Sequence, residues 1–271
     1  MITNTEIPNV PATSILGMIV SLIVSVGLPI FLLIVIRKKT GARISSFFIG
    51  AATFVIFALV LEQILHLVVV SATGTLLTDN IWLYALYGGL AAGIFEETGR
   101  YMAMKFCMKK SLDKQNAIMY GAGHGGIEAI LIAGLACVSN IITSVMINSG
   151  QMPTLLSVSG IDEATYQLTV SQLSVLGTTP SWQFYMAGLE RISAVIIHIA
   201  ASYLVYLAVK NKKVSWYLLA VLAHFLVDAI AVITAKYLPI LVVELVLLVF
   251  SAGFGYVIWR MYHKEPVKAE A

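Results

Sequence analysis

Seven long apolar stretches run through this sequence, and they constrain its fold more than any other feature. They lie at about 15–36, 46–70, 81–106, 116–147, 183–209, 215–236 and 238–261. A helix that crosses a bilayer needs roughly 20 mainly apolar residues, and each stretch is long enough. Only 11% of the 271 residues are charged, whereas soluble domains carry about 25%. The sequence therefore predicts an all-α polytopic membrane protein with about seven transmembrane helices.

The lysines and arginines between the predicted helices gather in alternate connectors. Fourteen of them follow the first, third, fifth and seventh helices, and Lys236 alone falls on the other side. Cytoplasmic segments of membrane proteins are enriched in lysine and arginine. This pattern predicts an external amino terminus and a cytoplasmic carboxyl terminus. The net charge of +3 is too small to indicate a nucleic-acid partner, whereas the apolar helices imply contact with the lipid bilayer.

The chain is expected to form a single membrane-embedded helical domain over residues 1–271. Its one long connector, at about 148–182, holds no lysine or arginine but several proline and glycine residues. The connector is therefore expected to be an external loop, with a short helix in its middle on the membrane surface. The helices that carry most polar residues place a catalytic core at about 81–236.

Thirteen ionisable residues fall within the predicted helices, where charged groups are costly and usually mark function. They are Glu62, His66, Glu96, Glu97, Arg100, His124, Glu128, Glu190, Arg191, His198, His224, Asp228 and Glu244. Lipid offers such groups no hydrogen-bonding partner, so their side chains are expected to face a shared polar interior. Glu190 with Arg191 is expected to be a structural pair, and Glu62 with His66 a packing or gate pair.

Spacing places several of these residues on common helix faces. Residues three or four apart are neighbours on one face, as are His124 and Glu128, and His224 and Asp228. With a rise of about 1.5 Å per residue, His124, His198 and His224 all lie roughly 12–16 Å from the cytoplasmic ends of their helices. The sequence thus predicts a layer of three imidazoles with adjacent carboxylates. A second layer of acids is expected about one turn further from the cytoplasm, with Asp228 beneath His224 and Glu128 beneath His124.

Two kinds of catalytic chemistry suit such a layer. Imidazole is a common zinc ligand, so His124, His198 and His224 are candidate ligands, and a nearby carboxylate could serve as general base. Without a metal, a buried glutamate could activate water directly while the imidazoles stabilise the oxyanion. Intramembrane acids and histidines also mark proton-coupled transporters, and a non-catalytic membrane scaffold is a further alternative. The residues alone leave these alternatives open.

Four short motifs follow one another through the third to sixth predicted helices. EETGR at 96–100 resembles the EExxR-type first motif of the membrane-embedded CAAX-protease superfamily, which includes the PrsW proteases. HGGIEA at 124–129, LERISAVIIH at 189–198 and HFLVD at 224–228 most closely resemble the YhfC family of intramembrane metalloproteases. The resemblance covers about half of the chain. Because the later motifs depart from the CAAX pattern, CAAX substrate specificity is not carried over.

This resemblance implies an intramembrane endopeptidase that acts on a membrane protein or peptide. It also implies a multi-pass protein of a bacterial plasma membrane. Glu96 or Glu97 would activate the attacking water, and Arg100 would pair with these glutamates.

The resemblance also assigns roles to the remaining motif residues. His124, His198 and His224 would be metal ligands, with zinc as the metal, or oxyanion stabilisers. Asp228 would support His224. The residues themselves, apart from the resemblance, leave Glu128 and Asp228 as either catalytic groups or structural supports for the imidazoles.

Overall fold

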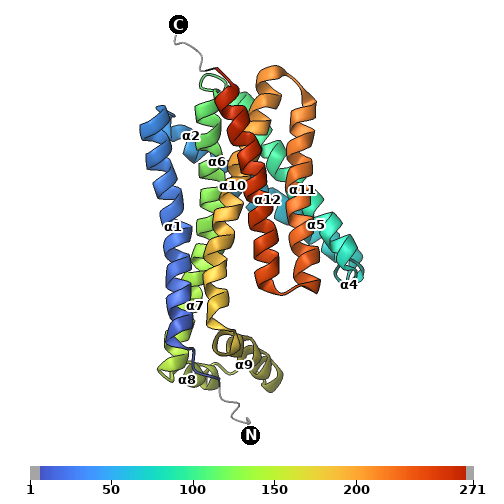
Figure 1. The fold of residues 1–271 in the computed structure, drawn as a ribbon. Helices are drawn as coiled ribbons and strands as arrows, with labels where there is room; N and C mark the ends of the chain where they lie inside the picture. Colours follow the sequence, from blue (N-terminus) through green and yellow to red (C-terminus); the bar gives the residue numbers. More distant parts are fainter. Residues whose placement is uncertain (1–6, 267–271) are drawn as a thin grey trace. The chain divides into compact units, whose positions relative to one another are not determined.

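The computed structural model describes residues 7–266, apart from the side chains of Pro153 and Ser157. All regular secondary structure in this part of the chain is helical (Figure 1). The α-helices and π-helical segments are, in chain order, α1 (Ala12–Thr40), α2 (Ile44–Ile56), η1 (Phe57–Glu62), α3 (Gln63–Thr73), α4 (Leu76–Asp79), α5 (Ile81–Met102), η2 (Ala103–Cys107), α6 (Lys114–Glu128), η3 (Ala129–Gly134), α7 (Leu135–Asn148), α8 (Gln151–Val158), α9 (Glu163–Thr178), α10 (Ser181–Asn211), α11 (Val214–Tyr237) and α12 (Ile240–Lys264).

Every stretch that was predicted to span the membrane is helical, with bounds that differ by a few residues. Among residues 7–266, six helical segments are long and apolar enough to cross a bilayer. They are Ala12–Thr40, Ile44–Thr73, Lys114–Asn148, Ser181–Asn211, Val214–Tyr237 and Ile240–Lys264. The seventh stretch forms α5, whose 22 residues include Glu96, Glu97 and Arg100 and are correspondingly less apolar. The all-α, multi-pass membrane fold is confirmed, and the orientation of its termini stays a prediction.

In the described chain, three π-helical segments lie next to polar residues; η1 and η3 interrupt long helices, and η2 ends α5. Glu62 closes η1, η2 begins three residues after Arg100, and η3 begins directly after Glu128. A π turn holds more residues than an α turn, so it rotates the faces of the helix on either side of it, and such segments are frequent at functional sites. Hydropathy contains no signal for them.

The described chain divides into two compact units. The smaller unit comprises the chain up to Val26 together with Ile130–Leu189. Ser21 joins two of its helices, because its hydroxyl donates to the carbonyl of Phe184 at 2.6 Å and accepts from the amide of Gly188 at 2.9 Å. The apolar core of this unit consists of Val10, Met18, Ile147, Met152, Leu156, Tyr166 and Val170.

The connector predicted at 148–182 contains two helices, α8 and α9. Gly150 precedes α8 in the left-handed region (φ 72°), where glycine is favoured. Asp162 caps α9, because its carboxylate accepts from the amide of Thr165 at 2.9 Å. A helix in this connector was expected and is confirmed, and the second one is additional. That α8 and α9 both lie outside the membrane stays a prediction.

The larger unit comprises Gly27–Ala129 and the chain from Glu190 onward. Within it, α2 packs along α6, and α5 packs along α11, and the second pair is seen side by side in Figure 1. From Val195 to Ala208, α10 is almost entirely buried, and it contributes much of the largest apolar cluster. These five helices position the polar residues that were predicted to form a site.

Glu265, which directly follows α12, forms hydrogen bonds with residues of α6 and α10. Its carboxylate accepts from the hydroxyls of Tyr203 and Tyr206, each at 2.6 Å, and pairs with Lys210. Lys114 donates to its backbone carbonyl. Burial alone raises the pKa of Glu265, but the hydrogen bonds from Lys210 and the two tyrosines outweigh burial, so the pKa lies below its usual value. The ends of the three helices are thereby held together.

Candidate active site

Glycines in α6 let two neighbouring helices approach His124 closely. A Cβ atom on Gly123 would lie 1.9 Å from the backbone oxygen of Phe47 in α2, and one on Gly121 would lie 2.6 Å from the Cα atom of Ile199 in α10. Only glycine fits at backbone contacts this close. His124 is therefore fully buried between helices.

Glycines in α5 have the same effect on α11. A Cβ atom on Gly89 would lie 2.9 Å from the backbone oxygen of Phe225, and one on Gly93 would lie 3.0 Å from that of Val221. The two helices thus pack backbone to backbone just before the acidic motif of α5. This packing brings His224 of α11 within reach of that motif.

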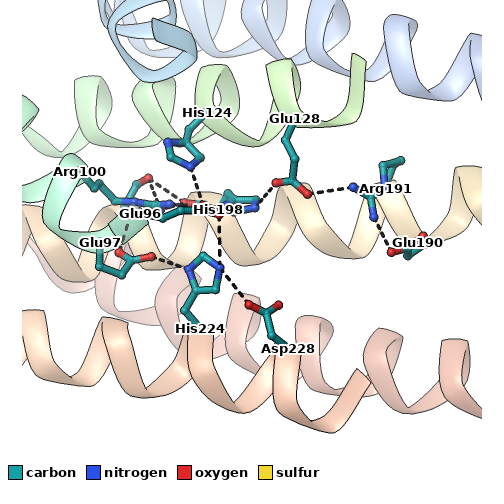
Figure 2. A network of polar contacts seen from close by, with 11 residues as sticks. Glu96, Glu97, Arg100, His124, Glu128, Glu190, Arg191, His198, His224 and Asp228 are labelled. Atoms are coloured by element: carbon teal, nitrogen blue, oxygen red, sulfur yellow. Dashed lines mark hydrogen bonds and ion pairs between the residues drawn. The ribbon is translucent and has the colours of Figure 1, made fainter. Parts of the chain in front are cut away.

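The carboxylate of Glu96 lies at the centre of the site, between three imidazoles (Figure 2). Its Oε2 is 2.9 Å from Nε2 of His124 and 3.8 Å from Nδ1 of His198. Its Oε1 is 3.9 Å from Nε2 of His224. The ring centroids of His124 and His198 are 5.0 Å apart, and those of His198 and His224 are 5.5 Å apart. The structure thus brings the three predicted imidazoles together around one carboxylate.

Further carboxylates contact the outer nitrogens of two of the imidazoles. Oε1 of Glu97 lies 2.9 Å from Nδ1 of His224, and Glu128 contacts Nε2 of His198. Oδ2 of Asp228 lies 3.6 Å from the other ring nitrogen of His224, Nε2, in line with their four-residue spacing. A carboxylate at an outer nitrogen orients an imidazole and selects its tautomer.

The expected pairing of Glu128 with His124 is wrong. Glu128 contacts His198 and Arg191 of α10 instead, and Nδ1 of His124 has no hydrogen-bond partner among the described residues. Four-residue spacing places two side chains on one helix face but does not make them turn toward each other. Here the guanidinium of Arg191, 2.8 Å from Oε1, draws Glu128 toward α10.

Arg100 joins α5 to α10 behind the imidazoles. Its Nε lies 3.3 Å from Oε2 of Glu97, and its Nη1 donates to the backbone oxygen of His198 at 2.7 Å and to the hydroxyl of Ser202 at 2.9 Å. Its Nη2 lies 3.2 Å from Nδ1 of His198. A donor at Nδ1 and a carboxylate at Nε2 favour the tautomer with hydrogen on Nε2. The lone pair of Nδ1 then accepts from Arg100, and Oε2 of Glu96 lies 3.8 Å from the same nitrogen.

Arg191 extends the network along α10. Its Nη1 donates to Glu128 at 2.8 Å, and its Nη2 pairs with Glu190. The predicted contact between Glu190 and Arg191 is present, and the link from Arg191 through Glu128 to His198 is an addition to it (Figure 2). The seven-residue spacing of Arg191 and His198 is the sequence signal for this link, because residues seven apart lie near one helix face.

Part of this polar network lines a cavity of about 140 Å³ in the larger unit. The Asp228 side chain is 35% exposed, whereas Glu97 is fully buried and is held by His224 and Arg100. Of the two adjacent glutamates, Glu96 is therefore the one that faces the cavity. The polar residues of the cavity wall are Glu96, Glu128, Glu190, Arg191, Ser193, His198, His224 and Asp228.

The donor atoms at the centre of the site fit a metal ion. A carboxylate oxygen of Glu96 and one ring nitrogen each of His124 and His198 lie within 4.8 Å of one another, and all three residues are buried. Two histidines and one glutamate are a ligand set of catalytic zinc sites. The network in Figure 2 also holds five carboxylates against two guanidinium groups. A divalent cation would offset most of this excess of negative charge.

Three further predicted residues share no hydrogen bond or ion pair with this network among the described residues. Glu62 and His66 form the expected pair, with 3.2 Å between Oε1 and Nε2, and Nδ1 of His66 lies 2.7 Å from the hydroxyl of Tyr87. Glu244 is buried in α12, and its Oε2 has no hydrogen-bond partner in the described chain.

The chain matches a family model described as YhfC intramembrane metalloprotease over residues 24–247. It is 41% identical over 209 residues to the "Uncharacterized membrane protein YhfC" of Bacillus subtilis (strain 168), and this match covers 76% of the chain and 79% of the relative. No solved structure matches the chain. The residues of the polar network all lie within the matched range, and the resemblance to the YhfC family is confirmed.

Proposed function

Because the chain belongs to the YhfC family of intramembrane metalloproteases, we propose that it is a membrane-embedded endopeptidase that hydrolyses a peptide bond of a membrane protein or peptide. The observation that carries this proposal is the buried group of Glu96, His124 and His198 beside a polar cavity. Ionisable groups within membrane helices are costly and usually serve function.

Glu96, His124 and His198 would hold the metal, and zinc is the ion that suits these donors. The chemistry that a bound zinc supplies is polarisation of the scissile carbonyl and a more nucleophilic water at neutral pH. Glu128 contacts Nε2 of His198 and so keeps the lone pair on Nδ1, the nitrogen that would bind the metal in place of its contact with Nη2 of Arg100. His224 is the candidate for an additional ligand, because its Nε2 lies 3.9 Å from Oε1 of Glu96.

Asp228 is the proposed general base. Its carboxylate is exposed to the cavity and contacts Nε2 of His224 at 3.6 Å. It accepts a proton from the attacking water and returns it to the nitrogen of the leaving amine, as a C–O bond forms and the C–N bond breaks. His224, held at Nδ1 by Glu97, keeps Asp228 in position. If the protein binds no metal, Glu96 takes the role of base that the family resemblance assigns to it.

The variant Asp228→Asn tests this assignment. We expect cleavage of quenched fluorescent peptides to fall by roughly 10²–10⁴-fold, with the zinc content and the thermal unfolding midpoint of the wild type retained. The measurement is made in proteoliposomes, with Asp79→Asn on the exposed face of α4 as the control that keeps full activity. Normal cleavage by Asp228→Asn would show that another group is the base.

The same preparation separates the other candidate functions. A non-catalytic scaffold predicts that the zinc-loaded wild type cleaves none of the peptides, and that variants of the polar network lose partner binding. A proton-coupled transporter predicts solute uptake that requires a proton gradient and is lost in Asp228→Asn. Peptide cleavage that depends on Asp228 contradicts both alternatives.

A further inference from the structure

Ser193 presents an unpaired hydroxyl in the wall of the cavity. It is 3% exposed, it lines the same cavity as His198, and its Oγ has no hydrogen-bond partner among the described residues. A serine inside a helix commonly donates to the carbonyl four residues earlier. Ser144 and Ser202 do so here, at 2.6 and 2.7 Å. Ser193 departs from this pattern.

Arg191 supplies a second unpaired donor in the same wall. Its Nη1 and Nη2 are used by Glu128 and Glu190, but its buried Nε has no partner within the described chain. A buried donor that lacks a partner is unfavourable unless a ligand or water completes it. Two such donors in one cavity wall indicate a ligand that offers hydrogen-bond acceptors.

The distance from the proposed metal site suits a peptide backbone. A helix rises about 1.5 Å per residue, so Ser193 lies roughly 7.5 Å along α10 from His198. An extended peptide advances about 3.3 Å per residue, so this distance corresponds to about two residues. Backbone carbonyls are acceptors that every peptide substrate carries at this spacing.

We infer that Ser193 is a substrate-binding residue whose hydroxyl donates to a backbone carbonyl of the substrate, about two residues from the scissile bond, in a cavity wall to which Arg191 also contributes. The inference rests on the proposed function and deepens it. It assigns to α10 a subsite for extended peptide, so that one helix contributes both a donor to the metal site and a contact to the substrate.

Hydroxamates are suitable probes, because the hydroxamate group binds zinc. The affinity added by an attached peptide then measures the contacts between that peptide and the cavity. Isothermal titration calorimetry of the zinc-loaded protein in detergent would compare acetohydroxamate with two dileucyl hydroxamates, one extended on its amino side and one on its carboxyl side. We expect one dileucyl probe to bind the wild type more tightly than acetohydroxamate does. Ser193→Ala should weaken that probe about three- to tenfold, the effect of one net hydrogen bond, and leave acetohydroxamate binding unchanged.

Two control variants accompany Ser193→Ala. Ser193→Thr keeps a hydroxyl and should restore the affinity for the dileucyl probe. Ser251→Ala removes a buried hydroxyl that donates to Leu248 at 3.0 Å, away from the cavity, and should leave all three affinities unchanged. The thermal unfolding midpoint of Ser193→Ala should be no lower than that of the wild type, because the variant loses an unpaired group.

Two results would overturn the inference about Ser193 without affecting the proposed metal site. One is equal affinity of the wild type and Ser193→Ala for both dileucyl probes, and the other is no gain of either probe over acetohydroxamate. In both cases acetohydroxamate binding would leave the proposed metal site standing. Failure of acetohydroxamate to bind the zinc-loaded wild type would instead overturn the metal site, and the inference with it.

Discussion

At the scale of single residues, Arg100 connects α5 to α10 at the site. It is fully buried, and it contacts Glu97 of its own helix as well as the backbone and ring of His198. A buried charge that loses its partner is strongly destabilising, whereas loss of both charges together is better tolerated. We therefore assign Arg100 to positioning and not to proton transfer.

Replacement of Arg100 by methionine tests this role. Arg100→Met should lower the free energy of unfolding by about 3–5 kcal/mol, because the buried carboxylate of Glu97 loses its guanidinium partner and keeps only the imidazole of His224. Adding Glu97→Gln to the same chain should recover part of the loss. Unfolding in mixed detergent micelles provides the measurement, and Arg260→Met on the exposed face of α12 is the control. A double variant less stable than Arg100→Met would show that the two residues are not coupled.

The members of the site could be predicted from the sequence, whereas the partner of Glu128 could not. Shared depth placed the three imidazoles in one layer, four-residue spacing placed Asp228 next to His224, and the structure brings these residues together. The partner of Glu128 depends on which neighbouring helix the side chain reaches, and spacing within one helix contains no such information. Ser193 has no sequence signal, because serine is common within membrane helices.

At the scale of helices, the glycines of α6 determine how closely the site is packed. A Cβ atom on Gly123 has no room beside the backbone of Phe47, so Gly123→Ala should separate α2 from α6 and lower the free energy of unfolding by about 1–3 kcal/mol or more. Gly88→Ala is the matched control, since a Cβ atom on Gly88 of α5 meets nothing within 4 Å. Thermal unfolding of both variants provides the measurement. Equal midpoints would contradict this assignment.

The helices themselves could be predicted closely, because apolar length alone identifies a membrane span. The interruptions could not. The π segments η1 and η3 lie inside apolar stretches that were predicted to be continuous helices, and η2 lies at the end of another. The change from i→i+4 to i→i+5 hydrogen bonds in a π segment leaves no signal in the hydropathy. Within the connector at 148–182, helix α9 packs Tyr166 and Val170 into an apolar core, a tertiary contact that a loop-like composition did not indicate.

At the scale of the whole molecule, the alternation of basic connectors predicts the orientation in the membrane. With Cys107 and Cys137 replaced by serine, a single cysteine at the exposed Ser159 should react with a membrane-impermeant maleimide in intact cells. A cysteine at the exposed Lys110 should react only after lysis. The reverse pattern of labelling would place the carboxyl terminus outside. It would also move the external connector to the cytoplasm.

The metal content of the purified protein tests most directly whether Glu96, His124 and His198 form a metal site. Protein purified in detergent without chelators is analysed by mass spectrometry for bound metals, together with alanine variants of the three residues. We predict stoichiometric zinc in the wild type, its loss in all three variants and its retention in the control His66→Ala, while retention in His224→Ala would exclude His224 as a further ligand. No metal in the wild type, or wild-type zinc in the variants of His124 and His198, would contradict the proposed metal centre.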